Sequence, residues 1–74
     1  MAVVDVEADI TGNVWKVVKS VGDSVEEDEP IMILESMKME IPVLSPDAGT
    51  IIEILAAPDD VVTQSQVVAR IEAE

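Results

Sequence analysis

Apolar residues recur at every second position more often than at the spacing of a helix face. Most are valine or isoleucine, whose branched side chains favour strands. The pattern therefore predicts an all-β protein without a long helix. The first predicted strand alternates Val4, Val6 and Ile10 with acidic residues, and the others cover residues 14–20, 31–36, 39–44, 51–57 and 67–71, with short bridges at 24–25 and 61–62.

Turn-forming residues separate these strands. Glycine, proline, asparagine or aspartate fall at residues 12–13, 22–23, 46–49 and 58–60, where the chain must reverse. The block Glu26-Glu27-Asp28-Glu29 cannot be buried and predicts a solvated turn before Pro30. A cation site in this block is the weaker interpretation, because adjacent acids lack the spaced oxygen ligands of a calcium loop. We therefore predict no metal site.

The two halves of the chain repeat each other at a distance of 37 residues. The identical pairs are Val6 and Val43, Gly12 and Gly49, Asp23 and Asp60, Val25 and Val62, and Glu35 and Glu72. Aliphatic residues align between them, and a shared order of turns and strands indicates a structural repeat. Residues 1–74 are short enough for only one domain. We expect a pseudo-twofold domain in which each half gives about four strands to two facing sheets.

The central strands meet at residues 35–40, where Met37-Lys38 forms a two-residue hairpin connection. This connection pairs Ser36 with Met39, Glu35 with Glu40, and Leu34 with Ile41. Methionine and lysine are poor residues for such a turn, and opposed acids destabilise a strand pair. Stability does not account for this tip, so Lys38 is the candidate functional residue. The methionines beside it offer adaptable apolar contact area to a protein partner.

Other candidate residues compete poorly with Lys38. Lys16 and Lys19 fall in the predicted strand 14–20 and are interpreted as its solvent-facing residues. Trp15 is interpreted as a residue of the core or its rim, and a role in docking a partner is the alternative. The hairpin should project from one end of the domain, with the chain termini at the other end.

Composition narrows the possible functions. Four basic residues against sixteen acidic ones give a net charge of −12, which repels nucleic acids and anionic membranes and leaves proteins as the expected partners. The chain has no histidine or cysteine, so the usual general base and thiolate nucleophile are missing and we predict no catalytic residues. No apolar run is long enough to cross a membrane, and acidic residues occupy the place of a secretory signal, which predicts a cytoplasmic location.

Three segments carry a family resemblance: VGDSV at residues 21–25, ESMKME at residues 35–40 and AGTI at residues 48–51. Together they resemble the biotinyl domains of biotin carboxyl carrier proteins, over nearly the whole chain. The chain is expected to be most similar to small free-standing biotin/lipoyl attachment proteins, since nothing flanks the repeat in this sequence. The resemblance implies a flattened barrel of two four-stranded antiparallel sheets with biotin joined to Lys38 by an amide bond. The implied recognition motif is Glu35, Ser36, Met37, Met39 and Glu40.

The resemblance implies a carrier and not an enzyme. A biotin protein ligase would attach biotin to Lys38, which would then carry carboxylate from a biotin carboxylase to a carboxyltransferase. The carrier is expected to be a monomer in isolation. Lipoate on Lys38 is the nearest alternative, although lipoyl domains generally have Asp-Lys-Ala where this chain has Met-Lys-Met. An unmodified structural or interaction domain is the alternative of another class.

The chain also departs from the family pattern. Asp59 stands where the second half usually has glycine, and Asp28 and Ser65 stand where glycine often precedes a long strand. Ser36 replaces a more frequent alanine. The first three departures are expected to affect turn geometry and stability, and not the modification.

Overall fold

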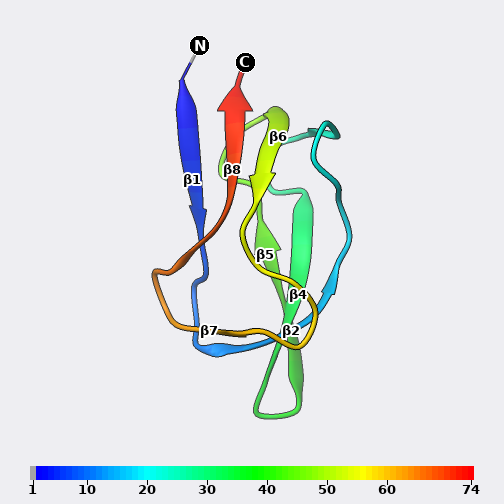
Figure 1. Cartoon of the computed structure of the whole chain (residues 1–74), viewed down its shortest axis with the longest axis vertical. Coiled ribbons are helices and arrows are strands. Elements are labelled where there is room, and N and C mark those ends of the chain that lie inside the picture. Colours follow the sequence, from blue (N-terminus) through cyan, green and yellow to red (C-terminus); the bar gives the residue numbers. More distant parts are fainter. Residues whose placement is uncertain (1) are drawn as a thin grey trace.

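The computed structural model describes residues 2–74 as eight strands in two four-stranded antiparallel sheets (Figure 1). The strands are β1 (Val3–Glu7), β2 (Gly12–Val17), β3 (Ser24–Val25), β4 (Pro30–Ser36), β5 (Met39–Leu44), β6 (Gly49–Ile54), β7 (Val61–Val62) and β8 (Val67–Ala73). The terminal sheet has the order β1-β8-β6-β3, and the hairpin sheet has the order β5-β4-β2-β7. The predicted all-β fold is confirmed, and no described residue lies in a helix that could cross a membrane.

The predicted repeat of 37 residues is present in the backbone. Strands β2, β3 and β4 begin and end 37 residues before β6, β7 and β8. The register shift between Val14 and Lys16 in β2 recurs between Ile51 and Glu53 in β6. Each sheet takes two strands from either half of the chain. The halves are therefore interleaved around a pseudo-twofold axis, and neither has a complete sheet without the other.

Left-handed backbone conformations recur at the same interval. Gly22 has a φ of 96°, and its counterpart Asp59 has a φ of 76°. Asp28 and Ser65, also 37 residues apart, have φ values of 67° and 72°. Glycine adopts this conformation at little cost, whereas other residues are strained in it. The three departures from the family pattern thus fall on turns that favour glycine, and they cost stability at positions outside the 35–40 motif.

Three strands are shorter than the alternation predicts. Strand β2 ends at Val17 and β6 ends at Ile54. A turn follows each strand: the N–H of Ser20 donates to the Asp23 carboxylate at 2.8 Å, and the N–H of Ala57 donates to the Asp60 carboxylate at 2.9 Å. Strand β1 ends before Ile10, which packs half-buried against the core. Local side-chain bonds to the backbone, which cannot be predicted from apolar spacing, thus follow the ends of β2 and β6.

The core lies between the two sheets and is entirely non-aromatic. Its members include Val6, Val14, Ile31, Met32, Leu34, Ile51, Val62, Val68 and Ile71, each no more than 2 % exposed. Burying such a side chain contributes about 1.5–3 kcal/mol. Trp15, interpreted as a residue of the core or its rim, does not lie in the core, because it is 47 % exposed. Trp15 occupies the β2 bulge, where one residue has no partner on β4.

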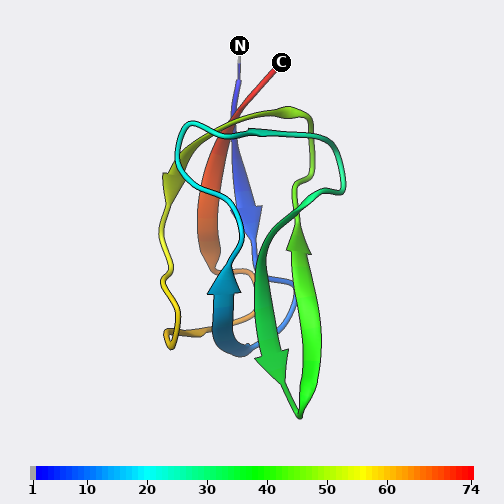
Figure 2. The same cartoon turned by 90° about the vertical axis from the view of Figure 1, so that its right-hand side faces the viewer.

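The domain is elongated, with extents of 36 × 19 × 18 Å. The β4–β5 hairpin projects from one end of the long axis, and both chain termini lie at the other end (Figures 1 and 2). The predicted placement of the hairpin and the termini is confirmed. The sheets therefore act as a spacer between the chain ends and the hairpin tip.

Gly49→Ala is expected to destabilise the protein more than Gly12→Ala. A Cβ atom at Gly12 would lie 2.7 Å from the backbone carbonyl oxygen of Glu35, and a Cβ at Gly49 would press closer on the carbonyl of Glu72, whose carbon is 2.9 Å away. The obstacle is backbone in both cases, and such overpacking costs about 1–3 kcal/mol. Urea denaturation of the two variants measures the difference. A Gly49→Ala protein as stable as wild type would contradict the close approach of β6 and β8.

Candidate functional site

The tip of the β4–β5 hairpin is a two-residue turn. Met37 and Lys38 have φ values of 51° and 63°, and positive φ at both central residues is the mark of a type I′ turn. The predicted register is confirmed: Ser36 pairs with Met39, Glu35 with Glu40, and Leu34 with Ile41. The type I′ turn matches the twist of the flanking strands, so the ladder continues up to the tip. Lys38 is therefore presented by a short, closed ribbon.

The side chains at the tip are exposed. Met37 is 92 % exposed and Met39 63 % exposed, and Lys38 between them is also exposed. No described residue forms a hydrogen bond or ion pair with the Lys38 side chain. Two large apolar side chains in water on either side of a free amine contribute nothing to the core. The tip is arranged for contact with another molecule.

The base of the hairpin is anchored in the core. Leu34 is fully buried, and β4 pairs with β5 on one edge and with β2 on the other. Gly12 at the start of β2 lies against the backbone of Glu35 and the Cβ of Ser36, where a larger residue would push the strands apart. The ribbon that carries Lys38 is thus held from three residues below its tip. Gly12 supports the site but lies outside the motif of residues 35–40. The only sign of its importance in the sequence is that glycine recurs 37 residues later, at Gly49.

Acidic side chains flank the tip. Glu35 and Glu40 are directly opposed across the two strands and exposed, and neither is in an ion pair with a described residue. Like charges placed opposite each other destabilise an antiparallel pair. Of the recognition motif, the structure brings Met37, Lys38 and Met39 to the tip and places the two carboxylates just below them.

The other two lysines have partners of their own. Lys19 lies beyond the end of β2, which corrects its prediction as a strand residue, and it forms an ion pair with Glu29. The hydrogen bond from Lys19 and a second one from the N–H of Glu26 hold the pKa of the Glu29 carboxyl below its usual value. Lys16 is exposed as predicted, and its Nζ lies 4.4 Å from the centre of the Trp15 ring. Lys38 is distinguished from both by its free amine and its place at the tip.

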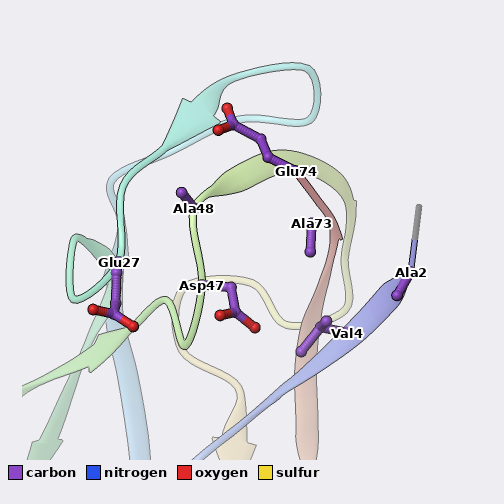
Figure 3. Close-up of a pocket in the computed structure, with 7 residues that line it drawn as sticks. All are labelled: Ala2, Val4, Glu27, Asp47, Ala48, Ala73 and Glu74. Carbon is purple, nitrogen blue, oxygen red and sulfur yellow. The ribbon is translucent and has the colours of Figure 1, made fainter.

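A pocket is present at the opposite end of the molecule (Figure 3). It is lined by Ala2, Val4, Glu27, Asp47, Ala48, Ala73 and Glu74. Three of these side chains are carboxylates and none is basic, so the pocket repels anionic ligands. No group of described residues could hold a metal ion. The functional chemistry of the described residues therefore concentrates on the hairpin tip.

The comparisons with known proteins agree with this geometry. The model of the biotin/lipoyl family described as "Biotin-requiring enzyme" matches residues 2–71. The chain is 39 % identical over 62 residues to the biotin/lipoyl attachment protein of Bacillus subtilis, which covers 84 % of this chain and 85 % of that protein. It is 40 % identical over 65 residues to the biotinylated protein TB7.3 homolog of Mycobacterium leprae, covering 88 % of this chain and 92 % of that protein.

Much larger proteins contain a similar domain. The chain is 47 % identical over 60 residues, 81 % of its length, to the dihydrolipoyllysine-residue acetyltransferase component of the pyruvate dehydrogenase complex of Corynebacterium glutamicum, but spans only 9 % of that protein. The structure of Kluyveromyces lactis urea carboxylase superposes with a TM-score of 0.92 at 33 % identity, over 97 % of this chain and 6 % of that one. The chain belongs to the biotin/lipoyl family.

Proposed function

We propose that this protein is a biotin carrier in which biotin is attached to the Nζ of Lys38 through an amide bond. The observation that carries the proposal is the free amine of Lys38, held at the tip of a type I′ turn between two exposed methionines. Lysine supplies a long flexible stem and a nucleophilic nitrogen, and the ribbon holds its base in place. Amide formation removes the lysine charge and takes the net charge from −12 to −13.

The contribution of the domain to the reaction is physical. Biotin on a tether would accept carboxylate at a biotin carboxylase and deliver it to a carboxyltransferase, and the partner enzymes would supply the catalytic groups. Tethering replaces free diffusion by an effective concentration of about millimolar order at each site. The long axis of 36 Å, with the tip at one end, keeps the rest of the domain clear of either active site.

Biotin is favoured over lipoate by the residues beside Lys38 and by the relatives. The flanking residues are Met37 and Met39, whereas lipoyl domains resemble Asp-Lys-Ala at this position. The mycobacterial relative is named as biotinylated, and the structural neighbour is a carboxylase. Lipoate is the second candidate, because the corynebacterial relative carries a lipoyl-lysine name at 47 % identity. Both cofactors would use the same amine.

The residues of the hairpin tip reduce the stability of the fold, which supports a functional reason for their presence. Non-glycine residues in the left-handed conformation cost about 1–2 kcal/mol each, and Met37 and Lys38 both adopt it. The opposed pair Glu35 and Glu40 adds electrostatic repulsion. Asparagine and glycine would form this turn without the strain. Destabilising residues are expected at a hairpin tip that another protein must recognise.

Lys38→Arg is expected to abolish modification. Arginine keeps the positive charge and the long stem, but its guanidinium does not form the amide. The full chain is co-expressed with a biotin protein ligase, and its intact mass is compared with the mass expected for one added biotinyl group. Lys16→Arg and Lys19→Arg are the matched controls and should still gain that group. Biotin retained in Lys38→Arg, or an unmodified wild type, would contradict the proposal, and a lipoyl increment would favour the second candidate.

Glu40→Gln is expected to raise the free energy of unfolding by about 0.2–1 kcal/mol, because it removes the repulsion from Glu35 across the strand pair. The matched control is Glu7→Gln, which removes the same charge from a residue paired with Val67. Thermal denaturation at low salt compares the two. Equal stabilisation of both variants would show that the effect comes from the net charge and not from the opposed pair.

A further inference from the structure

The outer faces of the two sheets differ at positions that the repeat makes equivalent. Across the hairpin sheet, one row runs through Lys16, Ile33 and Pro42. The equivalent row across the terminal sheet is Glu53, Arg70 and Asp5. The same backbone thus presents an apolar centre on one side and a charged centre on the other.

The charged row of the terminal sheet is satisfied within the protein. Arg70 donates from Nε to Asp5 and from Nη1 to Glu53, both at 2.9 Å. An apolar partner placed over this row would remove water from three charged groups without supplying new bonds, which is costly. The outer face of the terminal sheet is therefore better suited to face solvent than to bind an apolar partner.

The hairpin sheet exposes apolar side chains around its central row. Trp15 is 47 % exposed and Leu44 41 % exposed, and Pro42 is exposed on the edge strand β5. Their equivalents on the terminal sheet are Ile52, Glu7 and Asp5, of which two are charged. Tryptophan is enriched in the energetic centres of protein interfaces, and the Lys16 Nζ lies over the Trp15 ring, 4.4 Å from its centre.

This face is continuous with the tip that carries Lys38. Ile33 and Lys38 are five residues apart along the hairpin, or about 16 Å at roughly 3.3 Å per strand residue. An enzyme that modifies a bare lysine must seat its active site on the tip itself. Its surface then extends back over β4 and β5, past Glu35 and Glu40, which have no described cationic partner.

We propose that the outer face of the hairpin sheet, formed by Trp15, Ile33, Pro42 and Leu44, docks the enzyme that modifies Lys38. The matching enzyme surface has an apolar centre and carries lysine or arginine where it meets Glu35 and Glu40. A second copy of this chain is a poor occupant, since each copy carries a net charge of −12. This inference rests on the proposed function, because it names the partner that the modification requires.

The test is the steady-state rate of biotin transfer by a purified biotin protein ligase to the full unmodified chain. Trp15→Ser is expected to raise KM about tenfold with kcat within about twofold, which corresponds to ~1.4 kcal/mol of lost docking. Ile52→Ser, the equivalent change on the terminal sheet, should leave both constants unchanged. Leu44→Ser is a second docking variant that leaves the bulge intact, and thermal denaturation confirms that each variant is folded.

The outcomes separate the two proposals. A KM that rises for Trp15→Ser and Leu44→Ser but not for Ile52→Ser supports docking on the hairpin sheet. Equal KM values for all folded variants overturn the docking surface and leave modification of Lys38 standing. Absence of product from the wild-type chain overturns both proposals.

Discussion

The pairing of β4 with β5 through a two-residue turn is the constraint on which the site depends. Only Met37 and Lys38 lie between the paired residues Ser36 and Met39, and both adopt positive φ in a turn too short for either to fold back toward the core. A longer loop would let the lysine lie down on the sheet or pair with one of sixteen acids. The short turn keeps the amine in solvent, and the buried Leu34 below it keeps the ribbon in place.

The repeat explains how so short a chain can hold such a tip. Interleaving gives every buried strand of one half a partner from the other, so the aliphatic side chains of both halves share a single core. The geometry of β4 with β5 recurs as β8 with β1, where the chain termini take the place of the turn and Ala73 donates to Ala2 at 2.9 Å. One pseudo-symmetric end thus carries Lys38, while the two chain termini lie at the other end.

Much of this arrangement could be predicted from the sequence, because local rules specify it. The two-residue connection fixes the register, so the pairing of Glu35 with Glu40 follows from counting. The ends of β2 and β6 could not be predicted from apolar spacing, since hydrogen bonds to Asp23 and Asp60 end them. The bulge at Trp15 could not be predicted either, because it leaves both Trp15 and Lys16 exposed after the buried Val14 and makes no mark in the pattern of apolar residues.

Backbone strain occurs both at the hairpin tip and in turns elsewhere in the fold, and the two have different explanations. Small domains have only about 5–15 kcal/mol of net stability, and left-handed residues at Met37, Lys38, Asp28, Asp59 and Ser65 each reduce it. The last three lie in turns that glycine would relax, with no consequence for the exposed amine. At Met37 and Lys38, relaxation would require changing the residues that we propose the modifying enzyme recognises. The proposed function would therefore account for the strain at the tip, whereas the strain in the other turns is a cost that the shared core offsets.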